Sequence, residues 1–262
     1  MANKTNIKTP QELIDSSGNT MTIRVRDFLI NHGWKTTLSS YYVDTMTSKT
    51  RENDIVAIKN FTCSDALGRN VFLSVALVIE CKYITKNTVF WFDPMNIAMA
   101  QNSKNSHNQN TNYLGIHTLS LGNDYKPKEV AKLFEDGDTS GKPLFTGIDQ
   151  CLHGLIFQRD RMFGSTKYFG GGRIFLEYPV LLVNSFDYFY NPKCEKIGNN
   201  FLFEVDYSYL KNSEVQNEYF LVDIVSEELL EDFMTTIEED ILPLKIGIQD
   251  CSTEEVASKF GV

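Results

Sequence analysis

Residues 71–79 form a nearly unbroken apolar run, a pattern typical of a strand that is buried on both faces. Residues 54–62 have a similar content of β-branched and aromatic side chains. Between the two runs lies the polar segment Ser64-Asp65-Ala66-Leu67-Gly68-Arg69-Asn70, whose Gly and Asn favour a turn. The pattern therefore predicts an antiparallel hairpin centred on Leu67.

Two helices are indicated by apolar side chains at helical spacing. The first covers residues 22–31 and should end at Gly33, a typical helix stop. The second covers residues 146–163, and its predicted core-facing side chains are Ile148, Cys151, Leu152, Leu155 and Ile156. Further strands are predicted at residues 34–43, 87–92, 180–183 after the interruption at Glu177-Tyr178-Pro179, 200–210 and 218–225, and a last helix at residues 226–240.

Two segments lack a clear periodic pattern. Residues 101–113 are almost entirely polar, which favours a loop or an insertion beside a cleft. Gly170-Gly171-Gly172 is not followed by the Gly-Lys-Ser/Thr of a phosphate loop, so it is interpreted as a flexible hinge. The whole chain, residues 1–262, is predicted to form one α/β domain with a central mixed β-sheet flanked by helices.

The hairpin brings chemically active side chains together. Pairing around Leu67 gives cross-strand partners whose numbers add up to about 134, so Asp54 should lie opposite Glu80. Because side chains alternate along a strand, Glu80 and Lys82 share one face and Cys81 points to the other. Two neighbouring carboxylates repel each other unless a cation lies between them, and hard oxygen ligands suit Mg²⁺ or Mn²⁺. A solvated ion pair at a strand end is the simpler alternative.

The order of these residues carries a resemblance to a known family. Ser40-Tyr41-Tyr42-Val43-Asp44, Thr50-Arg51-Glu52-Asn53-Asp54-Ile55-Val56-Ala57 and Val78-Ile79-Glu80-Cys81-Lys82 together resemble the core of the PD-(D/E)XK nuclease superfamily, which has the restriction-endonuclease-like fold. The resemblance implies that Asp54 and Glu80 are metal ligands and that Lys82 is the catalytic lysine. It also implies a metal contact from the backbone carbonyl of Cys81.

The chain departs from the family pattern at two places. Asn53 stands where many members have proline, and Thr22 stands where many have a helix glutamate. Glu12 or Asp27 could take the place of that glutamate. Glu52, beside Asp54, and Gln150, on the second helix, are further candidates for the site. His153 lies on the same helix, where a single histidine is more typical of a hydrogen-bonded residue than of a general base.

Charge and cysteine content restrict the partners and the compartment. The formal net charge is −9, which argues against a strongly basic nucleic-acid surface, although Lys and Arg residues are concentrated in residues 1–130 and acids in residues 223–240. The five cysteines are scattered and form no CxxC pair, so reduced thiols are expected. No apolar signal region or membrane span is apparent, and a cytoplasmic location is predicted.

The resemblance implies a Mg²⁺- or Mn²⁺-dependent endonuclease that hydrolyses phosphodiester bonds, with DNA as the expected substrate and bacterial or phage defence as the expected setting. Its core would span residues 10–165, with a polar insertion near 100–115 and a C-terminal extension over 170–262. A homo-oligomer or a partner protein of a defence system is compatible with it. Two alternatives stay open: an inactive module of the same fold that binds nucleic acid or protein, and a structural or assembly protein.

Overall fold

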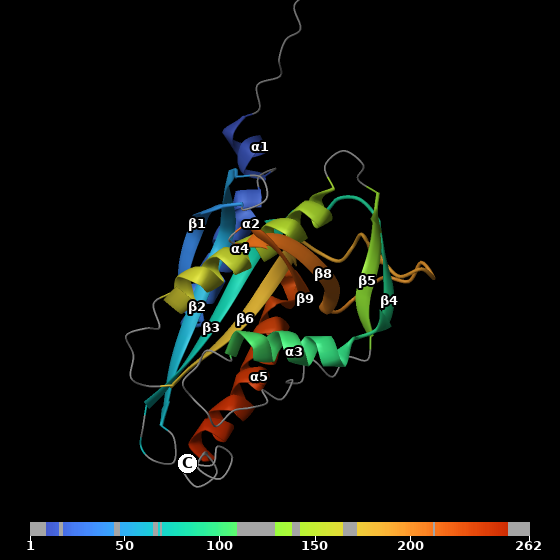
Figure 1. Ribbon diagram of the computed structural model, residues 1–262. Coiled ribbons are helices and arrows are strands. Elements are labelled where there is room, and N and C mark those ends of the chain that lie inside the picture. The colour runs from blue at the N-terminus through green and yellow to red at the C-terminus, as the bar shows by residue number, and fades with distance from the viewer. Residues whose placement is uncertain are drawn as a thin grey trace, which may run out of the picture.

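The fold is built around one large mixed β-sheet with helices on both faces (Figure 1). The computed structural model describes residues 9–15, 18–44, 48–64, 68, 70–108, 129–137, 142–164, 172–211 and 213–250. The helices are α1 (Pro10–Asp15), α2 (Gly18–Asn31), α3 (Ile97–Asn108), α4 (Pro143–Gly164), the 3₁₀-helix η3 (Glu227–Leu229) and α5 (Leu230–Asp250). The strands are β1 (Lys35–Val43), β2 (Thr50–Ser64), β3 (Asn70–Lys82), β4 (Thr88–Pro94), β5 (Glu129–Asp136), β6 (Gly172–Val183), β7 (Phe189–Tyr190), β8 (Phe201–Lys211) and β9 (Glu214–Ser226).

The strands follow the order β1-β2-β3-β6-β9-β8-β5-β4-β7 across the sheet. The first three are antiparallel, whereas β6 runs parallel to both β3 and β9. Strands β6, β9 and β8 therefore lie in the interior of the sheet, between β3 and β5. The C-terminal segment expected as an extension of the core supplies the middle of the sheet.

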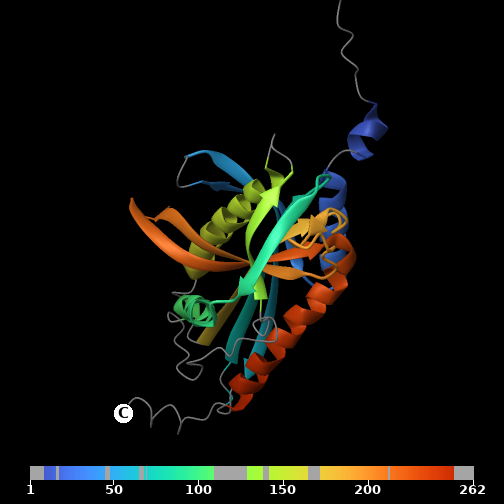
Figure 2. The ribbon, with the colours of Figure 1, turned by 90° about the vertical axis from the view of Figure 1, so that its right-hand side faces the viewer.

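Two hydrophobic layers cover the sheet, one on each face (Figure 2). On one face, α2 and α5 pack through Val25, Leu29, Phe233 and Ile237 against odd-numbered residues of β3 such as Leu77. On the other face, α4 packs on even-numbered residues of β3 and on β6, β8 and β9. Each strand of this central region is thus buried on both faces, which accounts for the unbroken apolar run in β3.

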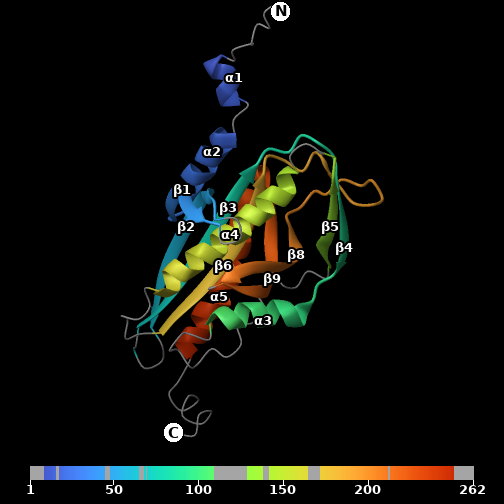
Figure 3. The same ribbon diagram turned by 45° about the horizontal axis from the view of Figure 1, so that its top comes forward.

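Most of the predicted elements are present with small shifts in their bounds. Helix α2 begins four residues earlier than predicted and is followed by Gly33, whose φ of 79° lets the chain turn out of the helix as expected. All five predicted core residues of α4 are buried. In Figure 3, α4 crosses over β3 and β6, while α1 projects away from the sheet.

Three predictions of structure are wrong or incomplete. Residues 101–108 are not a loop but continue α3, where Ser103 donates a hydrogen bond to the main-chain oxygen of Tyr219 (2.8 Å); residues 109–113 lie outside the described part. Strand β5 was not anticipated at all. Strand β6 begins at Gly172 and not after Pro179 as predicted, because it pairs with β3 along its whole length. Pro179 is tolerated there since β6 pairs with β9 only from Val180 onward.

Candidate active site

The β2–β3 hairpin has the predicted register. Ile55 pairs with Ile79 and Ser64 with Asn70, so partner numbers add up to 134 throughout. One position beyond the last of these pairs, Asp54 lies on β2 beside the end of β3. Its Oδ2 accepts a hydrogen bond from the backbone N–H of Cys81 (2.8 Å), which connects the first acid directly to the Glu80-Cys81-Lys82 segment.

Strand β2 changes the face that its odd-numbered residues present, and Asp54 lies at the change. Ile55 belongs to the hydrophobic layer under α2 and α5, whereas the side chain of Asn53 touches Gly154 of α4 on the opposite face. If side chains alternated strictly along β2, Asn53 and Ile55 would lie on the same face of the sheet. On the neighbouring strand, Ser39 lies at the same level with a φ of 48°, so both strands deviate together. The simple alternation used to predict the site therefore fails at Asp54.

Glu80 is a buried carboxyl group at the end of β3. Its side chain is 1% exposed, and burial together with the negative charge of Asp54 raises its pKa to about 8, although Lys82 opposes this shift. Oε2 accepts a hydrogen bond from Lys82 Nζ (3.2 Å). Oε1 is buried and has no hydrogen-bond partner among the described residues. An unpaired buried carboxylate oxygen is costly, which marks this position for a ligand.

Lys82 is held between β3 and α4. Besides Glu80, its Nζ donates a hydrogen bond to Gln150 Oε1 (2.8 Å), so Gln150 lies against the predicted lysine. The helix comes this close because residue 147 is glycine: a Cβ there would lie 2.9 Å from Lys82 Cγ and 2.5 Å from Leu181 Cδ1. The lysine is consequently fixed at both its stem and its ammonium group.

The raised pKa of Glu80 predicts a pH-dependent stability. An acid whose pKa is higher in the folded than in the unfolded state favours folding at low pH, so stability should fall as the pH rises from about 4.5 towards about 8. The slope from this group is at most about 1.4 kcal/mol per pH unit. Urea unfolding in a chelating buffer at pH 5, 6, 7 and 8 measures it. The difference between wild type and Glu80→Gln should grow with pH; a constant difference would contradict the assignment.

A second polar group, here called the His153 cluster, adjoins the first and consists of His153, Asp44, Arg51, Asp149 and Tyr207. His153 lies between two acids, with Nε2 3.4 Å from Asp44 Oδ1 and Nδ1 3.5 Å from Asp149 Oδ1. Arg51 Nε donates to Asp44 Oδ2 (2.9 Å), and Tyr207 OH donates to Asp149 Oδ1 (2.6 Å). All charges of this cluster are thereby compensated by neighbours.

The shifts in pKa within the cluster follow from these contacts. Burial by itself lowers the pKa of His153, but the hydrogen bond and the charge of Asp149 raise it by more, so the net shift is upward. Burial raises the pKa of Asp149, yet hydrogen bonds from His153 and Tyr207 outweigh burial and lower it. Asp149 is therefore a carboxylate at neutral pH.

Tyr42 connects the two groups. Its hydroxyl donates to the main-chain oxygen of Gln150 (3.2 Å), and its pKa is raised first by burial and then by the charge of Glu80. The charges of Arg51, Asp149 and Asp44 also act on this phenol. The catalytic candidates and the His153 cluster thus form one continuous polar region beneath α4.

The other candidates from the sequence do not join this region. Glu52 is exposed on β2, and Asp27 is exposed on α2 and paired with Arg26. The side chain of Glu12, on α1, lies outside the described part of the structure. Thr22 contributes a hydrogen bond to the thiol of Cys81, whose pKa is raised by burial and by Asp54. Of the glycines predicted as a hinge, Gly170 and Gly171 are not described and Gly172 begins β6.

Sequence reasoning missed Asp149 and Tyr207 and set His153 aside. The only local signal was the i,i+4 spacing of Asp149 and His153 on α4. Asp44 directly follows β1, and Arg51 and Tyr207 lie on β2 and β8, so these contacts depend on the order of strands in the sheet. The described cysteines, Cys63, Cys81, Cys151 and Cys194, are free, as expected.

Comparison with known proteins yields no relative: no family model, no curated protein and no solved structure matches the chain. Within the described residues, three or more His, Cys, Asp or Glu side chains nowhere gather in an arrangement that could hold a metal ion. Over the same residues, none of the helices has the length and apolar character needed to cross a membrane. The site must therefore be interpreted from its geometry.

Proposed function

We propose that this protein is a metal-dependent nuclease with a restriction-endonuclease-like core, and that it hydrolyses phosphodiester bonds of DNA at Asp54, Glu80 and Lys82. One observation carries the proposal. A buried carboxyl group, Glu80, keeps one oxygen without a hydrogen-bond partner among the described residues, beside a second carboxylate and a lysine fixed by Gln150. Such a costly arrangement is typical of catalytic sites.

The donor set fits a hard divalent cation. Asp54 and Glu80 would hold it, with the backbone carbonyl of Cys81 as a third protein ligand. Mg²⁺ usually retains several waters and takes only one or two carboxylates from a protein, so a site with two acidic side chains is sufficient. A cation would also counteract both causes of the raised pKa of Glu80, its burial and the negative charge of Asp54. When bound, it would supply Lewis-acid stabilisation of the phosphate and a more acidic water.

The protein groups would divide the remaining work. Lys82 would orient the attacking water and stabilise the charge that develops on the phosphate. Gln150 would hold the lysine in that position through its 2.8 Å hydrogen bond. The main-chain N–H of Cys81 would fix the carboxylate of Asp54, leaving its other oxygen for the cation. Burial by α4 would exclude bulk water from this chemistry.

Two observations favour a second candidate function, an inactive module of the same fold that binds without cutting. The described part of α2 offers Thr22 where a third carboxylate is expected, and several basic residues are already paired with acids. Arg24 contacts Glu227 (2.6 Å), and Lys59 lies 3.8 Å from Glu238. These ion pairs reduce the number of Lys and Arg side chains that can contact phosphates, compared with what the sequence suggested.

Metal binding and cleavage separate the two candidates. A nuclease should bind Mn²⁺ in a calorimetric titration and should nick or linearise supercoiled plasmid in Mg²⁺ but not in excess chelator. An inactive module should do neither at the Asp54–Glu80 site.

We expect Asp54→Asn to weaken Mn²⁺ binding by at least about tenfold, because it removes one of two charged ligands. The matched control is Asp232→Asn, an exposed aspartate on α5 across the sheet. Calorimetry on the three proteins measures the effect. Equal affinity in wild type and Asp54→Asn would reject Asp54 as a ligand and with it the proposed centre.

A further inference from the structure

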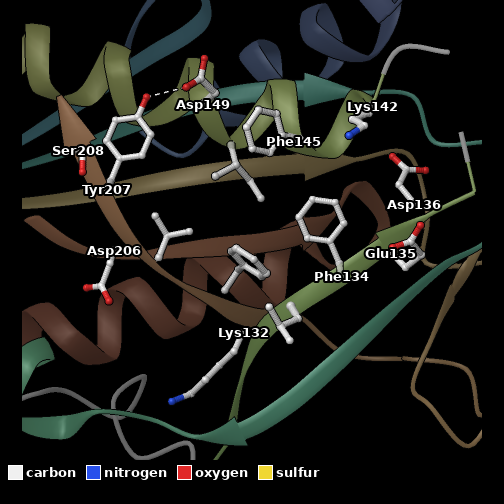
Figure 4. A pocket seen from close by; sticks show the side chains of 14 residues that line it. Lys132, Phe134, Glu135, Asp136, Lys142, Phe145, Asp149, Asp206, Tyr207 and Ser208 are labelled. Atoms are coloured by element: carbon white, nitrogen blue, oxygen red, sulfur yellow. Dashed lines mark hydrogen bonds between the residues drawn. The ribbon is translucent and has the colours of Figure 1, made fainter. Parts of the chain in front are cut away.

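A cavity of about 550 Å³ lies beside the His153 cluster, between the first turns of α4 and strands β5 and β8 (Figure 4). Its volume is in the range of small-molecule sites, and neither Asp54 nor Glu80 lines it. Lys82 does not line it either: on α4, Asp149 lines the cavity and the next residue, Gln150, contacts the lysine. The proposed cleavage reaction leaves this space without a role.

Aromatic rings from three different elements line the cavity. Phe145 comes from α4, Phe134 from β5 and Phe203 from β8. Phe134 and Phe203 pack edge to face, with their centroids 5.5 Å apart, which fixes one wall. Phe145 is 60% exposed although it is a large apolar side chain. A flat apolar ligand between Phe145 and this wall would cover it.

Polar groups at one end and at the rim favour a ligand with hydrogen-bond donors. Asp149 lines the cavity; its Oδ1 accepts a hydrogen bond from Tyr207 (2.6 Å), and its Oδ2 accepts none from the described residues. The lining contains four carboxylates but only two lysines, Lys132 and Lys142. Lys132 is already near Glu204 (3.3 Å). This excess of negative charge disfavours phosphate inside the cavity.

We propose that the cavity binds a planar aromatic heterocycle that carries an exocyclic amino group, of the nucleobase type, stacked against Phe145 with its N–H donors directed to Asp149. Adenine, guanine and cytosine have such a group and thymine does not. The base could arrive as a free nucleoside or as an unstacked base of a nucleic-acid strand. The inference goes beyond the proposed cleavage reaction and does not require it.

Calorimetry in excess chelator tests this site without any contribution from cleavage. The probes are guanosine, adenosine, cytidine and thymidine, and two thymidine octanucleotides, one of them with a single central guanosine. We expect at least one amino-bearing nucleoside, or the guanosine-containing strand, to bind at least about tenfold more tightly than its thymidine counterpart. If only the nucleosides show the preference for an amino-bearing base, the ligand is a free nucleoside. If only the octanucleotides show it, the ligand is an unstacked base of a nucleic-acid strand.

Phe145→Ala should weaken the binding of the preferred probe by about tenfold or more, since stacking of a base on an aromatic ring contributes this much. Because Phe145 is largely exposed, the variant should fold normally. Tyr41→Ala, which removes an exposed ring on β1 outside the cavity, is the control and should bind like wild type. The inference is overturned if no probe binds, if thymidine binds as well as the amino-bearing nucleosides, or if Phe145→Ala has no effect.

Discussion

Replacing Lys82 with methionine should reduce plasmid cleavage in Mg²⁺ by about a hundredfold to a thousandfold. In the proposed reaction its ammonium group lies next to the phosphate that gains charge, and loss of one such preorganised donor typically costs this much. Methionine keeps an unbranched apolar stem against Leu181 and residue 147 of α4. The loss should appear in kcat with little change in KM, because the charge acts mainly in the transition state.

The control for this experiment is Lys86→Met, an exposed lysine in the segment that follows β3. Thermal unfolding of both variants shows whether they are folded. Lys82→Met should also increase the pKa of Glu80, since Lys82 is a group that lowers it. Cleavage at the wild-type rate by a folded Lys82→Met protein would refute the catalytic role of the lysine, whatever the metal affinity.

The parts of the fold that depend on residues close together in the sequence were predictable from the sequence. The register of β2 and β3 follows from the length of one turn, and the burial of β3 follows from its apolar run. The position of β6 and β9 between β3 and β8 could not be predicted, because it depends on non-local pairings: Val71 of β3 pairs with Gly172 of β6, and Val180 of β6 pairs with Asp223 of β9. Strand β5 was missed because its sequence, EVAKLFED, mixes Glu129, Lys132, Glu135 and Asp136 with apolar residues and lacks the strict alternation of a strand with one buried face.

The same division applies to the site. Asp54, Glu80 and Lys82 come from one hairpin, so counting residues was enough to bring them together. Gln150 required the packing of α4 on the sheet and was only a weak candidate. The reversal of faces at Asp54 had no sequence signal: it coincides with a positive φ at Ser39 of the adjacent strand, which a serine within a strand does not indicate.

Gly154→Ala should destabilise the protein by at least about 2 kcal/mol, although glycine in a helix is usually improved by alanine. The ordinary gain is about 0.5–1 kcal/mol. Here a Cβ would overlap Asn53 Oδ1 and would lie 2.5 Å from its Cγ and 2.6 Å from its Nδ2. Asn53 is 0% exposed, so its amide cannot swing out into solvent and the overlap must be relieved by rearrangement within the packed layer between β2 and α4. Urea unfolding measures the change.

A double-mutant cycle with Asn53→Ala tests the cause. Neither polar atom of the Asn53 amide has a hydrogen-bond partner among the described residues, so its removal loses packing but leaves no donor or acceptor unpaired. Asn53→Ala should therefore restore most of the stability lost in Gly154→Ala, whereas Gly198→Ala, with nothing within 4 Å of its Cβ, should change little. If Gly154→Ala is stabilising, Asn53 does not face α4, and the reversal that positions Asp54 against Cys81 is absent. Strict alternation would then place Asp54 on the same face as Glu80, as the sequence alone predicts, so this experiment tests the local geometry of β2 and leaves the proposed centre to the metal-binding and cleavage assays.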